Sequence, residues 1–162
     1  MQRYRDEYQH YLNTATKTGS TTSQTWKREG EGVESLSVSF NPQIDTYKTI
    51  LSRQAQSTFN NYQLSTSVSG KRCYSEDPIY DYLDELRRTA TAGETQWLEI
   101  DTAKTNGTAG HYLAVEYDVL ITINEWLGDN ATISYDINYS NPRVGIATIS
   151  GDTISFVEST SL

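Results

Sequence analysis

Cysteine, methionine and proline are scarce in this chain of 162 residues, which contains one cysteine, one methionine and three prolines. A single cysteine excludes a disulfide within the chain, and with two histidines far apart it leaves no zinc-binding constellation. Long apolar runs are missing as well. No stretch approaches the roughly 20 apolar residues of a membrane span, and residues 1–7 lack the apolar centre of a signal peptide. We therefore expect no membrane contact, and synthesis in a reducing cytoplasm.

Basic residues are almost missing from the second half of the chain. Residues 89–162 contain only Lys104 and Arg143 against ten carboxylates, whereas residues 1–88 carry equal numbers of basic and acidic side chains. The net charge of −8 therefore belongs to the second half. Because proteins bind phosphate backbones mainly through Lys and Arg, this pattern argues against affinity for nucleic acid. Simple solubility is the plainer explanation of the acidity.

Tyrosine is the abundant large residue. The chain has 12 tyrosines, although hydrophobic residues make up only 36% of it and the mean hydropathy is −0.62. A tyrosine has an apolar ring and a polar tip, so it suits surfaces that become buried only on assembly. The length fits one domain, residues 1–162, with a modest core.

The first sixty residues are mostly polar. We expect residues 1–31 to form an N-terminal arm, because they show no sustained apolar period. Alternation predicts a half-buried strand over residues 36–40. Residues 41–60 are expected to form a long connection, either a partner-binding loop or a loop with a short helix at 48–55, since loops of this length are usually functional or disordered. The apolar residues of this connection are Ile44, Tyr47, Ile50, Leu51 and Phe59.

One helix is predicted over residues 77–91. Asp77 is a suitable N-cap, Pro78 suits the first turn, and Gly93 can end the helix. The apolar positions that recur at helical spacing are Ile79, Leu83, Leu86 and Ala90. A strand over residues 62–68, ending at Gly70, precedes this helix.

The remaining sequence indicates β-structure throughout. Alternation and branched or aromatic residues predict strands over residues 97–101, 112–123, 133–139, 144–149 and 153–157. Turns are expected at Asn106-Gly107, at Asn141-Pro142 and at Gly151-Asp152, the last within a hairpin. About seven strands and one helix predict a mainly β fold: an antiparallel sandwich or barrel with the helix covering one end or edge.

Catalytic chemistry finds little support. Cys73 lies beside Lys71 and Arg72, which favour a thiolate, but no histidine is near in sequence to act as a base. The acidic cluster Asp77, Asp81, Asp84 and Glu85 is explained by a solvated helix face rather than a metal site. Aromatic residues at strand spacing are better explained by packing than by a stacking platform. We expect no catalytic residues, no cofactor and no metal.

Three segments together resemble a known family. Residues 38–43 read VSFNPQ, residues 77–88 read DPIYDYLDELRR, and residues 94–100 read ETQWLEI. In this order they resemble the tail tube (major tail) proteins of phages and prophages of Gram-positive bacteria. The resemblance covers roughly residues 28–145, and the helix motif is its most specific part. The first thirty residues and the tail after Gly145 depart from it.

The resemblance implies a small β-barrel or sandwich with a flanking helix, similar to the tube protein of type VI secretion systems. Subunits of this family form hexameric rings that stack into a tube through which DNA passes without specific binding. The implied partners are further copies of the chain, the tape-measure protein, the tail terminator, baseplate proteins and, in a contractile tail, a sheath. The implied location is the virion, and the arm and long connection fall where such a tube needs contacts.

Two sets of residues follow as hypotheses. Carboxylates on the face opposite the apolar positions of their strands are candidates to line the channel, or else face outer solvent. These candidates are Glu99, Asp101, Glu116, Asp118 and Asp136. Large apolar residues of the long connection and the tyrosines of the helix are candidates for assembly contacts. These are Ile44, Tyr47, Ile50, Leu51, Phe59, Tyr80 and Tyr82.

Three other readings stay open. Another ring-forming protein of the same particle, such as a tail terminator or capsid decoration protein, would not polymerise into long tubes alone. A carbohydrate-binding β-sandwich would stay monomeric and present its Tyr and Trp rings to glycans. An enzyme would need a catalytic constellation that the sequence does not offer.

Overall fold

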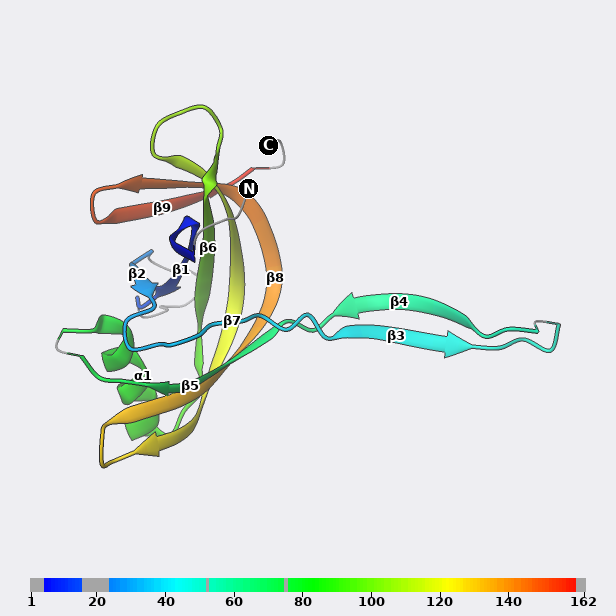
Figure 1. Cartoon of the computed structure of the whole chain (residues 1–162), viewed down its shortest axis with the longest axis horizontal. Helices are drawn as coiled ribbons and strands as arrows, with labels where there is room; N and C mark the ends of the chain where they lie inside the picture. The colour runs from blue at the N-terminus through cyan, green and yellow to red at the C-terminus, as the bar shows by residue number, and fades with distance from the viewer. Residues whose placement is uncertain (1–4, 16–23, 52, 75, 160–162) are drawn as a thin grey trace.

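The computed structural model describes residues 5–15, 24–51, 53–74 and 76–159 (Figure 1). Its elements in chain order are η1 (Arg5–Glu7), β1 (Tyr8–Asn13), β2 (Trp26–Glu29), β3 (Pro42–Tyr47), β4 (Gln56–Tyr62), β5 (Ser65–Lys71), α1 (Pro78–Thr89), β6 (Gly93–Thr105), β7 (His111–Leu127), β8 (Thr132–Ser150) and β9 (Thr153–Glu158).

A curved, nearly closed antiparallel sheet forms the body. Its strands follow the order β2-β1-β6-β7-β8-β5, and β9 pairs with β8 beside this path. Strands β3 and β4 form a separate two-stranded sheet that projects away from the body (Figure 1). The prediction of a mainly β fold with about seven sheet strands and one helix is confirmed.

The sheet carries a core on each of its faces. Trp97 and Leu98 are neighbours on β6 and point to opposite faces, yet both are fully buried. Trp97 belongs to the main core, which also contains Leu83 of α1 and Ile121 of β7. Leu98 belongs to a smaller second core, with Phe156 of β9. Burial of both faces explains why β6 does not show the simple alternation of a half-exposed strand.

Helix α1 covers one end of the sheet as predicted, with Asp77 as its N-cap. The Asp77 side chain accepts hydrogen bonds from the backbone N–H groups of Ile79 and Tyr80 at 3.0 and 3.3 Å. The helix ends at Ala90, which has a left-handed conformation, and not at Gly93. Gly93 starts β6, where a Cβ would lie 2.6 Å from the Tyr82 hydroxyl. Close packing of the helix on the strand therefore explains this glycine.

The predicted N-terminal arm is wrong for much of its length. Strand β1 pairs with β6 through Tyr8–Leu12 and with β2 through His10–Asn13, so both strands belong to the body. Leu12 and Trp26 are buried in the two cores. Their burial could not be read from a segment that has few apolar residues. Residues 1–4 and 16–23 of the predicted arm lie outside the described residues.

The predictions for residues 36–60 also need correction. Residues 36–40 contribute only an isolated bridge between Ser39 and Ser65 instead of a strand. Residues 41–60 hold the hairpin β3–β4, not a loop, and its described tip residues show turns rather than a helix at 48–55. Polar side chains dominate both strands, so apolar alternation did not reveal them.

Asn141-Pro142 does not turn the chain, because β8 runs through it. Glu116 pairs with Arg143 and Asp118 pairs with Ser140, so two residues of β8 oppose Tyr117 alone. Asn141 takes a left-handed conformation with φ 48°. This geometry is a β-bulge, which is one of the few places where a sheet accepts proline.

A buried ion cluster closes the seam between the sheet edges. A register shift after Val68, where Gly70 has φ 68°, turns the side chain of Lys71 inward. The Lys71 ammonium lies 2.8 Å from a Glu29 carboxylate oxygen and 2.9 Å from an Asp77 carboxylate oxygen. Burial would lower the pKa of Lys71, but these carboxylates outweigh it and hold the pKa above its usual value. The cluster links β5, β2 and the start of α1.

Candidate functional site

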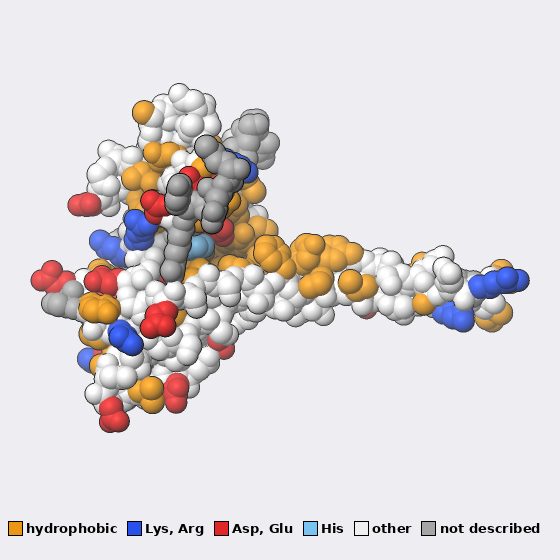
Figure 2. All heavy atoms as spheres, in the orientation of Figure 1, with side chains coloured by type: hydrophobic (Ala, Val, Ile, Leu, Met, Phe, Trp, Pro, Cys, Tyr) orange, Lys and Arg blue, Asp and Glu red, His pale blue; other side chains and the backbone are white. Residues whose placement is uncertain are grey.

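The β3–β4 hairpin stands out from the body as a single exposed layer. Every residue of β4 is exposed, and in β3 only Gln43 is partly covered. Figure 2 shows the hairpin extending well beyond the body, with apolar side chains near its base and again at its tip. An isolated two-stranded hairpin is at best marginally stable in water. The hairpin is therefore the part of the molecule that most needs a contact from outside.

Aromatic rings gather at the base of the hairpin. The Phe59 and Tyr62 ring centroids lie 4.7 Å apart, and Phe40 meets Tyr62 edge-on at 5.6 Å. Phe59 also pairs with Ile44 across the ladder. These residues remain about half exposed, so the cluster forms an apolar surface rather than a core.

At the tip, Ile50 and Leu51 are essentially fully exposed, at 103% and 97%. Lys48 and Arg53 flank them and are also exposed, and they form the basic end seen in Figure 2. The tip therefore combines two aliphatic side chains with two cations. No other described part of the chain exposes aliphatic side chains to this extent.

The predicted assembly contacts divide into two groups. The five on the hairpin are all exposed: Ile44, Tyr47, Ile50, Leu51 and Phe59. The two on the helix are not. Tyr80 is 7% exposed and its hydroxyl donates a hydrogen bond to the Ala131 carbonyl at 2.7 Å. Tyr82 is partly buried against the main core. Tyr80 therefore faces the chain's own core and offers little side-chain surface for an assembly contact, which stays a prediction for the helix.

The five candidate channel carboxylates do not share a face. The register places Glu99 and Asp101 on the same face of β6 as Trp97, which is the main-core face. Burial, and then the charge of Asp101, raise the pKa of Glu99. The sequence predicts Glu99 and Asp101 on the face opposite the core positions of their strand. That prediction is wrong, because β6 is buried on both faces.

Glu116, Asp118 and Asp136 lie on the opposite, outer face. Here Arg143 joins the first two: its guanidinium donates to Glu116 at 2.8 Å and to both Asp118 oxygens at 2.8 and 3.2 Å. These hydrogen bonds, with Asp118 contributing most, raise the pKa of Arg143. Burial raises the pKa of Glu116 against the opposing effect of Arg143. The charge of this pair of carboxylates is thus partly neutralised.

The outer face continues as an open polar surface beyond Arg143. Asp118 pairs with Gln96 and Ser140, and Asp136 pairs with Thr122 and accepts a hydrogen bond from Ser67 at 2.6 Å. Glu94 belongs to this surface as well, opposite Leu120. Sequence analysis missed Glu94 because it started the strand at residue 97, whereas β6 begins at Gly93. We call Glu94, Asp118 and Asp136, together with Gln96, Thr122 and Ser140, the open acidic face.

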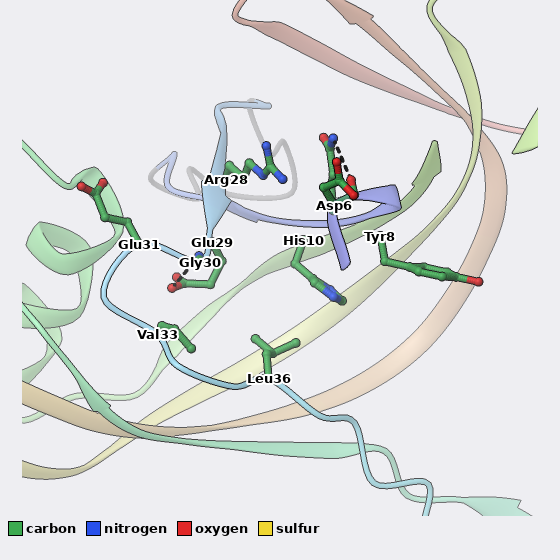
Figure 3. Close-up of a pocket in the computed structure, with 10 residues that line it drawn as sticks. Asp6, Tyr8, His10, Arg28, Glu29, Gly30, Glu31, Val33 and Leu36 are labelled. Carbon is green, nitrogen blue, oxygen red and sulfur yellow. Dashed lines mark hydrogen bonds between the residues drawn. The ribbon is translucent and has the colours of Figure 1, made fainter. Parts of the chain in front are cut away.

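A cavity of about 760 Å³ lies between β1, the end of β2 and the segment that follows. Figure 3 shows His10 and Glu29 on one side of it, facing Val33 and Leu36. The His10 ring packs 5.9 Å from Trp97, and burial, with Arg28 nearby, lowers the pKa of His10 to about 4. His10 is therefore neutral at pH 7. The other lining residues are Asp6, Tyr8, Gln9, Arg28, Gly30 and Glu31.

The remaining sequence candidates are the cysteine and the acidic residues of the helix. Cys73 is exposed. Asp77 caps α1, and Asp84 pairs with Arg87 at 2.7 Å and with Arg88. Within the described residues, no group of three or more His, Cys, Asp or Glu side chains is placed to hold a metal ion. Nor does any helix in the described ranges have the length and apolar character needed to span a membrane.

Comparisons with known proteins give little. No known family profile matches the chain, and no curated protein matches it in sequence. Among solved structures, a chain described as part of a six-fold symmetrised cryo-EM structure of the anti-feeding prophage (AFP) baseplate is similar over 85% of this chain and 89% of that one, with a TM-score of 0.40 and 8% identity. A likeness at this level carries no argument about function.

Proposed function

We propose that this chain is a structural subunit of a phage-type tail that self-assembles into hexameric rings stacked as a tube for DNA passage. The observation that carries the proposal is the projecting hairpin. Its five predicted contact residues are all exposed, and within the described part of the chain no second layer covers the hairpin. Exposed apolar surface concentrated in this way usually marks a protein interface.

The open acidic face suits the wall of a DNA channel. Duplex DNA carries about one negative charge per 1.7 Å, so a wall of carboxylates has little attraction for it. We place Glu94, Asp118 and Asp136 on this wall. We leave out Glu99 and Asp101, which lie on the main-core face, and Glu116, which is buried beside Arg143. The proposal gives the chain no catalytic role. Its partners are other copies of itself and the tape-measure, terminator, baseplate and sheath proteins of such a particle.

The assembly is tested by negative-stain electron microscopy of the purified chain at high concentration. We expect tubes of uniform width. Replacing Ile50 and Leu51 together by Asp should abolish the tubes and leave the circular dichroism spectrum unchanged. Val157→Asp is the matched control, because Val157 is also an exposed aliphatic residue, at 67%, but lies on β9. Small monodisperse particles from the wild-type chain would contradict the proposal, and isolated rings would favour a terminator or decoration protein.

The channel wall is tested on assembled tubes with fluorescent duplex DNA. The triple variant Glu94→Gln, Asp118→Asn, Asp136→Asn should retain more DNA on sedimentation than the wild type. The control removes three exposed carboxylates from turns and strand ends: Glu125→Gln, Asp129→Asn and Asp152→Asn. If both triple variants retain the same amount of DNA, the open acidic face does not line the channel.

A further inference from the structure

The hairpin tip and the cavity beside β1 have complementary chemistry. The tip presents Ile50 and Leu51 between the cations Lys48 and Arg53. The cavity has aliphatic side chains on one side, Val33 and Leu36. The apolar pair at the tip therefore has an apolar counterpart, the cavity wall, on the same chain.

Acidic residues predominate on the polar side of the cavity. Among the charged residues that line it, Asp6, Glu29 and Glu31 outnumber Arg28. Glu29 is buried, with an exposed fraction of 6%, and one of its carboxylate oxygens lies 2.8 Å from the Lys71 ammonium. Asp6 and Glu31 are exposed at the rim. Rim carboxylates of this kind attract cations and help to orient a docking partner.

The tip cannot reach the cavity of its own chain. From Pro42 to Leu51 the hairpin extends roughly 30 Å, at about 3.3 Å per residue. It projects away from the body, to which the cavity-lining strands β1 and β2 belong, so the tip lies far from these strands (Figure 1). A contact between them must therefore join two copies. Because the two surfaces differ, a joined pair keeps one unused tip on one copy and one unused cavity on the other, and such head-to-tail contacts produce rings or filaments.

We propose that the hairpin tip of one copy docks in the cavity beside β1 of a second copy. Ile50 and Leu51 cover Val33 and Leu36, while Lys48 and Arg53 face Asp6 and Glu31 at the rim. This inference rests on the proposed function in one respect, namely that copies of the chain assemble with one another, and it names the surface that receives the hairpin.

The test is disulfide formation between two populations of the full chain, both carrying Cys73→Ser. One carries Leu51→Cys at the tip and the other Leu36→Cys in the cavity, so a mixed disulfide forms only between copies. We expect at least about tenfold more mixed disulfide than with Val157→Cys as the partner, because docking holds the thiols at a millimolar effective concentration. Equal yields from the two pairs would overturn the inference.

A charge exchange gives a second readout that leaves the cavity's apolar side intact. Lys48→Glu with Arg53→Glu should weaken assembly, as should Asp6→Lys with Glu31→Lys. Mixing these two variants should restore assembly between them, because the rim charges are opposite again. No recovery on mixing would contradict the docking.

The outcomes separate the inference from the proposed function. Tubes that form without the disulfide between the Leu51→Cys and Leu36→Cys chains, and without recovery on mixing, would leave the tube function standing and remove the docking site. The disulfide and recovery in a complex that never forms rings would do the reverse. Absence of any assembly would contradict both.

Discussion

The body and the hairpin of this chain are stabilised in opposite ways. The body has two cores, and Trp97 and Leu98 are fully buried on opposite faces of β6. The hairpin has only the β3–β4 ladder and a half-exposed aromatic cluster at its base. Burial of apolar area is the main favourable term in folding. The body can therefore fold on its own contacts, whereas the hairpin gains most of its burial only from another molecule.

The largest effect on the body is expected from Lys71→Met. The change removes the cation between Glu29 and Asp77 and leaves two buried carboxylates without their ammonium partner. Loss of one member of a buried ion cluster costs about 3–5 kcal/mol. Urea unfolding of the dilute chain measures this as a lower free energy of unfolding.

Arg72→Met is the matched control, because Arg72 is the next residue and its ion pair with Glu34, at 3.9 Å, lies at the surface. An exposed pair of this kind contributes less than about 1 kcal/mol. Equal losses for the two variants would mean that the seam cluster does not stabilise the body.

Leu83→Ala tests whether α1 belongs to the body. Leu83 is fully buried in the main core, so its truncation should lower the free energy of unfolding by about 3 kcal/mol. Asp81→Ala, on the exposed side of the same helix, should change it by less than about 0.5 kcal/mol. A loss of only a few tenths for Leu83→Ala would show that the helix is not packed on the core.

His10 makes the stability of the body depend on pH. Its pKa is about 4 in the folded chain because burial disfavours the cation, against about 6.5 when unfolded. The unfolded chain therefore binds more protons between these values, and stability falls as the pH falls. Relative to His10→Gln, the wild type should lose about 2 kcal/mol between pH 7.5 and pH 5. Parallel curves for the two proteins would exclude this cause.

Sequence reasoning succeeded where local chemistry decides the structure. The start of α1 at Asp77 and Pro78 follows from capping and backbone geometry, and the Gly151-Asp152 turn follows from turn preferences. Long strands of branched and aromatic residues were recognised for the same reason. These signals lie within a few residues of one another in the chain.

It failed where distant segments decide the structure. Strands β1 and β2 are polar, and only pairing with β6 makes them part of the sheet. Which face of β6 is buried depends on what covers each face, so Glu99 was assigned to the wrong side. The hairpin was missed as a pair of strands because its apolar residues are not covered within the chain. Its exposed residues were nevertheless recognised as contact candidates.

The smallest effect on stability should come from the hairpin itself. Phe59 is about half exposed and touches mainly Tyr62 and Ile44. Phe59→Ser should therefore lower the free energy of unfolding of the dilute chain by no more than about 1.5 kcal/mol, the upper end of the range for an aromatic pair. The same change should reduce tube formation strongly, because assembly and not folding covers this ring. A variant that unfolds easily, or that assembles as well as the wild type, would contradict the division between a self-sufficient body and a hairpin completed by its neighbour.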